Sequence, residues 1–128
     1  MHSDSTTSLL SILRPFKRLV EVGIGSRFDV AHSLSENRII VATDIHQCNP
    51  PDGVQFVLDD ICDPLLDLYS KADIIYALNL PPELHQPTLN VALQVKSKFL
   101  FTTLGNDFPE IPVRIETTPG ETIYWALE

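Results

Sequence analysis

The sequence predicts an α/β protein with a three-layer α/β/α Rossmann-like sheet that is parallel except for an antiparallel C-terminal hairpin. Strand-like apolar runs alternate with short helical patterns, which favours a parallel sheet with helices on both faces. The first apolar run ends in the glycine turn 23–25, and the next ends in Asp44, 21 positions after Gly23. Pro119-Gly120 joins two alternating segments and predicts the hairpin.

Each predicted helix has a local reason. The first ends because Pro15 stops it, and a short helix opens at Pro64, with Asp63 as its N-cap. The other two carry apolar side chains at helical spacing. We expect helices over 5–13, over 28–34 after the glycines, at Pro64 and over 87–95. We expect strands over 18–22, 38–43, 55–58, 72–77, 99–103, 113–117 and 122–127. The first, second, fourth and fifth strands are apolar enough to be central.

The length of 128 residues and the 44% hydrophobic content fit a single Rossmann-like domain over residues 1–128. Residues 1–16 form an N-terminal helical extension of that domain. The helix that a repeating pattern would place between the fifth strand and the hairpin is missing or reduced to the loop 104–112. The uncovered sheet face would suit a homodimer or a partner protein. Tyr124 and Trp125 are expected to pack on opposite faces of the last strand.

The net charge of −8 argues against non-specific binding of nucleic acid. Arg14, Lys17 and Arg18 form the only basic cluster in the sequence, which we interpret as a solvated helix end or strand entry. No apolar run is long enough to span a membrane, and the N-terminus lacks a secretory signal pattern. Cys48 and Cys62 fit no zinc or redox spacing, so we expect two free thiols in a cytoplasmic protein.

The glycine turn and Asp44 together favour a nucleotide-binding site. A backbone without Cβ lets a ligand approach closely, and a carboxylate at the end of the second strand can accept hydrogen bonds from ribose hydroxyls. Taken separately, Gly23 and Gly25 also fit a tight turn without ligand, and Asp44 fits an ordinary capping residue. Their spacing favours the site.

With these motifs the sequence resembles the class I S-adenosylmethionine-dependent methyltransferases, from about residue 17 to the end. That family opens with an acidic residue followed by Gly-x-Gly, as at 21–25 here. The resemblance implies that Glu21 and Gly25 shape the methionine pocket and that Asp44 holds the ribose. It also implies that Asp60, or alternatively Asp59, meets the adenine amino group.

The C-terminal hairpin is also a mark of that family and argues against an all-parallel dehydrogenase-type sheet. Within the superfamily the chain is most similar to a small uncharacterised archaeal family with a trimmed fold. The members of that family carry a Pro-Pro-Glu-Leu stretch like residues 81–84 and lack a separate substrate domain. No activity comes with that resemblance.

The family's fourth motif resembles residues 79–82, Asn-Leu-Pro-Pro, and implies that Asn79 and Glu83 face the methyl acceptor. His85 is a candidate general base, because its ordinary pKa lies near neutrality. The alternative is a surface histidine in the first turn of a helix. Amine methyltransferases often have Asn or Asp directly before Pro-Pro and an aromatic residue. Here Leu80 intervenes and Glu83 replaces the aromatic, so the amine-binding role is not carried over.

Some alternatives stay open at this level. Arg27 replaces the usual third glycine and would place a cation beside an anion at the helix start. A metal site can be drawn from Asp44, His46, Cys48 and Asp60, but nothing fixes its geometry, and we expect no metal. The expected function is binding of S-adenosylmethionine and methyl transfer to an unidentified acceptor. A non-catalytic nucleotide-binding or interaction module is the alternative, and an NAD-binding module is less favoured.

Overall fold

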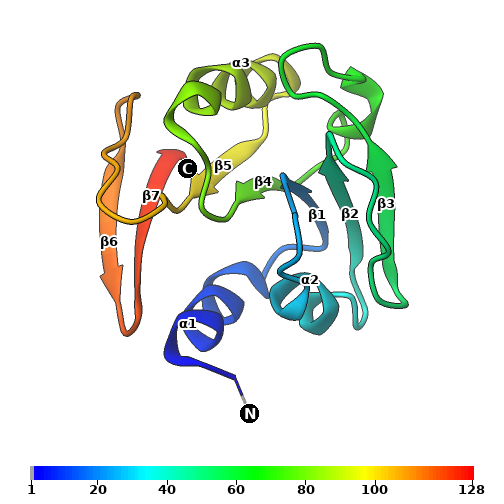
Figure 1. The fold of residues 1–128 in the computed structure, drawn as a ribbon, viewed down its shortest axis with the longest axis horizontal. Coiled ribbons are helices and arrows are strands. Elements are labelled where there is room, and N and C mark those ends of the chain that lie inside the picture. Colours follow the sequence, from blue (N-terminus) through cyan, green and yellow to red (C-terminus); the bar gives the residue numbers. More distant parts are fainter. Residues whose placement is uncertain (1) are drawn as a thin grey trace.

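The computed structural model describes residues 2–128 and shows a seven-stranded sheet with helices on both faces (Figure 1). The strands lie in the order β3-β2-β1-β4-β5-β7-β6. Strands β1 to β5 are parallel, and β7 is antiparallel to both β5 and β6, which confirms the predicted fold class. The strands are β1 (Arg18–Val22), β2 (Ile39–Asp44), β3 (Val54–Leu58), β4 (Ile74–Ala77), β5 (Lys98–Phe101), β6 (Arg114–Thr118) and β7 (Glu121–Leu127).

In Figure 1, α1 and α2 lie below the sheet and α3 lies above it. The Ser3 side chain caps α1 by accepting a hydrogen bond from the Thr6 backbone N–H. The last helix begins at His85, two residues before the predicted start. The helices are α1 (Asp4–Leu13), α2 (Asp29–Leu34) and α3 (His85–Val95), with single 3-10 turns η1 (Leu66–Leu68) and η2 (Pro82–Leu84).

The predicted helix at Pro64 with Asp63 as its N-cap is wrong. Only the 3-10 turn η1 forms there, and its N-cap residue is Leu65. The Leu65 backbone N–H donates to the Asp59 carboxylate instead. Asp59 takes this role because its side chain is buried beneath the turn, whereas Asp63 is exposed.

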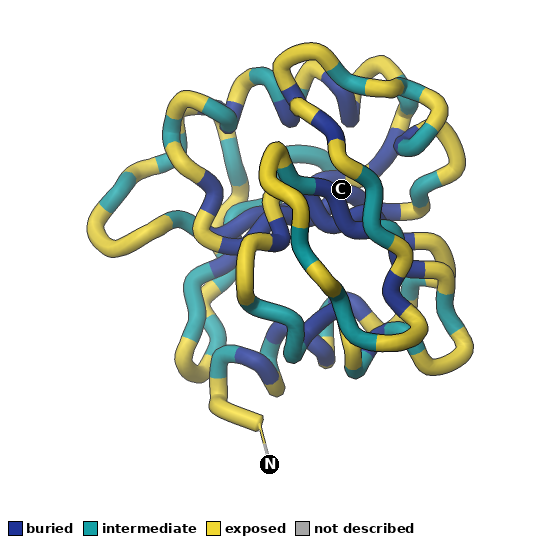
Figure 2. Tube along the Cα trace, turned by 45° about the vertical axis from the view of Figure 1, so that its right-hand side comes forward, coloured by how far each residue is buried: buried dark blue, intermediate teal, exposed yellow. Residues whose placement is uncertain are grey.

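Alternate side chains of the central strands enter the two halves of the core, as the two-residue period of a strand requires. Leu19 and Tyr76 pack against α1 and α2 on one face of the sheet, and Val20 and Ile75 pack against α3 on the other. Trp125 and Tyr124 join opposite halves, which confirms the prediction for these two residues. Figure 2 shows the buried strands enclosed by exposed loops.

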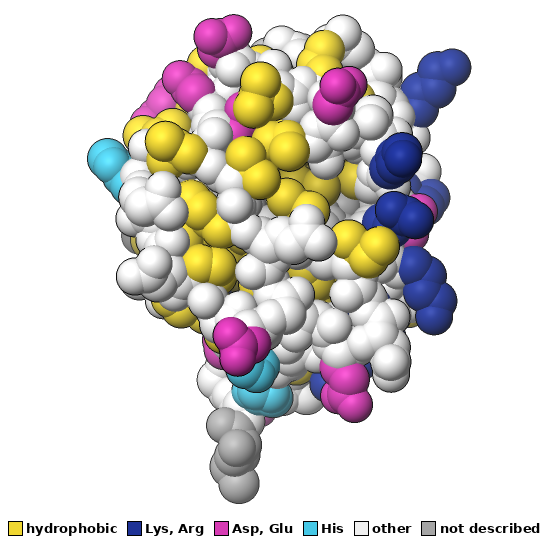
Figure 3. Space-filling model, turned by 90° about the vertical axis from the view of Figure 1, so that its right-hand side faces the viewer, with side chains coloured by type: hydrophobic (Ala, Val, Ile, Leu, Met, Phe, Trp, Pro, Cys, Tyr) yellow, Lys and Arg dark blue, Asp and Glu magenta, His cyan; other side chains and the backbone are white. Residues whose placement is uncertain are grey.

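The sheet is covered sparsely. Within residues 2–128, no helix joins β2 to β3 or β5 to β6, so the loop predicted over 104–112 is confirmed. Ile45 and Leu58, at the carboxyl ends of β2 and β3, are 61% and 53% exposed. Figure 3 shows apolar side chains gathered on the face of the molecule at the β3 edge. None of the helices formed by the described residues is long and apolar enough to cross a membrane.

Candidate functional site

A pocket of about 360 Å³ lies at the carboxyl ends of the central parallel strands. The sheet order changes direction beside β1, which pairs with β2 on one side and with β4 on the other. Open α/β sheets bind their ligands at such a switch point. The volume falls within the range of small-molecule sites. The pocket is lined by Val22, Gly23, Thr43, Asp44, Ile45, His46, Asp59, Asp60, Ile61, Asn79, Pro81 and Leu84.

The glycine turn after β1 leaves open space in front of the backbone. Gly23 and Gly25 have φ angles of +68° and +58°, which side chains with a Cβ rarely adopt. A Cβ added at either glycine would meet no atom within 4 Å. The turn is held from behind, because the Gly23 and Ile24 N–H groups both donate to the Thr43 carbonyl at 2.8 and 3.1 Å. The turn is therefore fixed in place, and a ligand can approach it.

Asp44 joins this turn to the end of β2. Its Oδ2 accepts a hydrogen bond of 2.8 Å from the Gly25 N–H, and its Oδ1 accepts one of 3.0 Å from the His46 N–H. Both bonds fix the orientation of the half-buried carboxylate. A carboxylate has about four acceptor positions, so it can still accept hydrogen bonds from a ligand.

The structure separates the roles of the two neighbouring acids Asp59 and Asp60. The Asp59 carboxylate is buried and accepts hydrogen bonds from the Leu65 N–H and the Tyr69 hydroxyl. Burial raises the pKa of Tyr69 above its usual value, and the hydrogen bond to Asp59 raises it further. Asp60 is exposed, and among the described residues its carboxylate accepts only the Cys62 N–H. Of the two acids, Asp60 is therefore the one available to a ligand.

Glu21 lies at the end of β1 on the other face of the sheet, beside Tyr76 of β4, and does not line the pocket. It is 1% exposed, and its Oε1 has no hydrogen-bond partner within the described residues. Burial raises the pKa of Glu21 to about 8, and the nearby Tyr76 hydroxyl and Arg27 offset part of that rise. The carboxyl group is therefore protonated at neutral pH.

Arg27 is turned away from the pocket. Its Nε lies 3.1 Å from Asp29 Oδ1, and its guanidinium donates to the Thr6 hydroxyl of α1. Burial raises the pKa of Asp29, but hydrogen bonds from Thr6 and Arg27 outweigh that effect and lower it. The Arg27 charge is thus neutralised at the junction of α1 and α2, and it does not face a ligand anion as the sequence suggested.

The three candidate residues in the segment after β4, Asn79, Glu83 and His85, have different positions relative to the pocket. Asn79 is exposed, lines the pocket and has a φ of +55°. Glu83 is exposed but does not line the pocket. His85 is completely buried, so the surface position considered for it is wrong. Its Nε2 lies 2.9 Å from the Leu80 carbonyl, and its Nδ1 accepts the Glu110 N–H at 3.1 Å.

Of the four residues of the metal site considered above, Asp44, His46 and Asp60 line the pocket, and Cys48 does not. No group of three or more His, Cys, Asp or Glu side chains within residues 2–128 could hold a metal ion. Sequence reasoning missed the apolar part of the pocket, above all Ile45, Ile61 and Leu84. Ile45 and Ile61 each follow directly after an acidic site residue, and this adjacency is the signal that could have identified them.

Comparisons with known proteins agree with this architecture. Residues 6–127 match the Uncharacterised protein family (UPF0146). A UPF0146 protein of the archaeon Halobacterium salinarum is 44% identical over 107 residues, covering 83% of each chain.

The RNA methyltransferase of Salinibacter ruber, solved with S-adenosyl-L-homocysteine, superposes with a TM-score of 0.62 at 16% identity and covers 100% of this chain and 94% of its own. Magnesium protoporphyrin IX methyltransferase from Synechocystis, solved with S-adenosylmethionine, superposes with a TM-score of 0.61 at 13% identity. The match covers 97% of this chain and 76% of the Synechocystis chain. These likenesses show a methyltransferase-like fold. The extent of the family match and the identity to the Halobacterium protein show that this chain belongs to the archaeal UPF0146 family.

Proposed function

We propose that the protein binds S-adenosylmethionine at the carboxyl ends of β1, β2 and β3 and transfers its methyl group to an acceptor. The observation that carries this proposal is the charge of the pocket. Asp44, Asp59 and Asp60 line it, and among the described residues no Lys or Arg side chain does. Such a lining repels the phosphates of NAD and ATP and attracts a sulfonium cation, since opposite charges attract more strongly where water is partly excluded.

The residues present fit the nucleoside part of this cofactor. The remaining acceptor positions of Asp44 are available to the two ribose hydroxyls. Asp60 has a free carboxylate oxygen for the amino group of adenine. Ile61 and Leu84 provide apolar surface for the ring. Gly23 leaves room for the chain that joins the ribose to the sulfur.

The methionine part would lie near the glycine turn. Glu21 lies on the other face of the sheet at the end of β1, and its Oε1 lacks a partner. We assign the pocket contacts of this part to Gly23 and Asn79, and no direct ligand contact to Glu21. Gly25 acts indirectly, through its hydrogen bond to Asp44.

Bound S-adenosylmethionine supplies an activated methyl group, and the protein has to place an acceptor in line with it. Asn79 is exposed at the pocket, and Glu83 is exposed beside it, so the acceptor would approach from the segment after β4. His85 is not available as a base, because both ring nitrogens face backbone groups. Glu83 is therefore the only one of the two candidate bases in this segment that is open to an acceptor.

Methyl transfer is tested with S-adenosylmethionine labelled in its methyl group and acceptor pools of RNA, protein and small molecules from an archaeal extract. The proposal predicts labelled product in one pool and none with Asp44→Ala protein. The matched control is Asp63→Ala, which removes an exposed acid that does not line the pocket. Saturable cofactor binding without label in any pool would contradict methyl transfer while leaving the binding site intact.

The second candidate is a nucleotide-binding module without turnover. The burial of His85 favours it, as does the absence of a helix between β5 and β6 in the described residues, because the acceptor side of the pocket has few walls. A second copy of the chain or a partner protein could supply those walls. In both cases we propose a cytoplasmic protein, in line with its two free cysteines.

A further inference from the structure

The opposite edge of the sheet carries most of the positive charge of this acidic protein. The amino ends of the parallel strands meet there, and we call this surface the amino-end edge. Of the nine Lys and Arg residues in the chain, seven belong to the loops or first strand residues at this edge. They are Arg14, Lys17, Arg18, Arg38, Lys71, Lys96 and Lys98. Figure 3 shows Lys and Arg side chains along one margin of the molecule and none along the opposite margin.

Within the part of the chain that the structure describes, these seven cations make no ion pairs. The two ion pairs found within residues 2–128 are Arg27–Asp29 and Arg114–Glu128, and neither includes a member of the cluster. Asp73, just before β4 at this edge, accepts hydrogen bonds from the backbone N–H groups of Lys17 and Arg18. Six of the seven cationic side chains are exposed. Unpaired, exposed cations gathered on a protein of net charge −8 can attract a polyanion to this edge.

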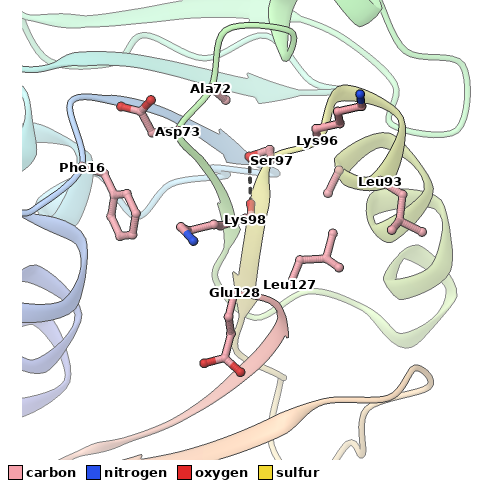
Figure 4. A pocket seen from close by; sticks show the side chains of 10 residues that line it. Phe16, Ala72, Asp73, Leu93, Lys96, Ser97, Lys98, Leu127 and Glu128 are labelled. Carbon is pink, nitrogen blue, oxygen red and sulfur yellow. Dashed lines mark hydrogen bonds between the residues drawn. The ribbon is translucent and has the colours of Figure 1, made fainter.

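The surface between the cations is hollowed. One hollow of about 590 Å³ lies beside the end of α3 and the start of β5, and Phe16, Lys96 and Lys98 line it together with the acids Asp73 and Glu128. Figure 4 shows the Lys98 side chain pointing toward the Phe16 ring. A second hollow shares Ala72 with the first and has Arg18, Lys71 and the acid Asp67 in its lining. Both hollows therefore border Ala72, and four of the seven cations line them.

We propose that the amino-end edge binds a single-stranded nucleic acid, with its phosphates on the cations and a base against Phe16. Four adjacent strands span roughly 14 Å, enough for a few successive phosphates. An aromatic ring beside cations favours a nucleic acid over an acidic peptide, because unpaired bases stack on aromatic side chains. The net charge of the chain argues against such binding only when the charges are averaged over the whole surface.

The test uses fluorescence anisotropy with the full chain and labelled oligonucleotides of about 12 nucleotides. Single-stranded RNA, single-stranded DNA and duplex DNA of one sequence are compared between about 50 and 200 mM salt. We expect micromolar binding of the single strands at low salt, weakening as salt rises, and weaker binding of the duplex. A difference between RNA and DNA would identify which of the two the edge prefers.

The decisive variant is Lys71→Gln/Lys98→Gln. It should reduce affinity about tenfold and lower the slope of log affinity against log salt by about 1.4. Gln86→Glu/Asn106→Asp changes the net charge by the same amount at exposed positions away from the edge, and it should bind like the parent protein. Phe16→Leu should weaken single-strand binding at least fivefold without changing the salt slope.

Three results would overturn the proposal. They are no saturable binding of any oligonucleotide at about 50 mM salt, an equal loss of affinity in the charge-matched control, and an unchanged affinity in the lysine variant. Self-association that the lysine variant abolishes would instead identify the acidic edge of a second copy as the occupant. Thermal melting checks that each variant is folded. If Phe16→Leu does not fold, the variant Lys71→Gln/Lys98→Gln still decides the test, because both lysines are exposed. Cofactor binding at the opposite edge is measured separately, so the two proposals fail independently.

Discussion

The Gly25 N–H donates a 2.8 Å hydrogen bond to Asp44 Oδ2, which joins the turn after β1 to the carboxylate that ends β2. One carboxylate therefore holds the glycine turn in position while it faces the pocket. The two halves of the motif depend on each other, so the effect of removing Asp44 will extend beyond a single ligand contact.

Asp44→Ala should abolish detectable cofactor binding, because it removes the ribose acceptor and releases the Gly25 N–H. Asp44→Asn keeps one acceptor oxygen and should retain weak binding, reduced about tenfold or more. Isothermal calorimetry on both variants measures the difference. Equal affinities of Asp44→Ala and the parent protein would contradict this role.

Asp59→Ala should lower the free energy of unfolding by about 2–3 kcal/mol, since it leaves the buried Tyr69 hydroxyl and the Leu65 N–H without their acceptor. Asp60→Ala should change stability by less than about 0.5 kcal/mol and should weaken cofactor binding instead. Urea unfolding and calorimetry on the pair separate the two effects. The reverse pattern would assign the ligand to Asp59.

Glu21→Gln should change the pH dependence of stability. The pKa of Glu21 is about 8 in the folded state against 4.5 ordinarily, so the folded state holds an extra proton between these values. The stability that comes from this group is present below about pH 4.5 and declines as pH rises to 8, by up to about 1.4 kcal/mol per unit. The neutral glutamine removes that decline. Urea unfolding from pH 5 to 9, with the exposed Glu83→Gln as the control, measures it, and parallel curves for parent and Glu21→Gln would refute the assignment.

Lys96→Gly should stabilise the protein by about 0.5–1 kcal/mol. Lys96 ends α3 at φ +60° and ψ +40°, a left-handed conformation that glycine adopts without strain. The gain from relieved strain exceeds the entropy that glycine adds to the unfolded chain. Thermal melting provides the measurement, and Lys96→Ala, which keeps a Cβ, is the control that should show no such gain.

His85→Ala should destabilise the fold by about 2–4 kcal/mol, because the ring fills a buried position 4.5 Å from the Phe101 ring and bonds two backbone groups. His85→Asn keeps part of the hydrogen bonding and should lose less. Hydrogen exchange at the Glu110 amide reports the contact directly. Unchanged protection of that amide in His85→Ala would show that the contact does not hold the loop.

Much of this fold could be predicted from short stretches of sequence. The predicted first strand has the observed bounds, and short patterns of residue type also predict the glycine turn, the position of Asp44 and the hairpin at Pro119-Gly120. Such patterns act through backbone conformation and side-chain alternation, which need no knowledge of distant contacts.

The wrong predictions concern residues whose positions depend on contacts with residues far away in the sequence. His85 is buried because the backbone at Glu110, 25 residues later, folds over it. Asp59 rather than Asp63 holds the turn η1, because the Tyr69 hydroxyl and the Leu65 N–H both donate hydrogen bonds to the Asp59 carboxylate. In the sequence the positive edge was visible only as the cluster of three basic residues at positions 14–18, because the parallel order of the strands brings the other four to the same edge. These four are Arg38, Lys71, Lys96 and Lys98.

The most direct test of the central proposal is a calorimetric titration of the purified chain with S-adenosylmethionine, its demethylated product, NAD and ATP. The nucleoside contacts proposed for Asp44 and Asp60 predict saturable binding of the first two at micromolar concentration, and the acidic lining predicts none of the phosphate-bearing pair. Binding of NAD or ATP without binding of S-adenosylmethionine would contradict the account.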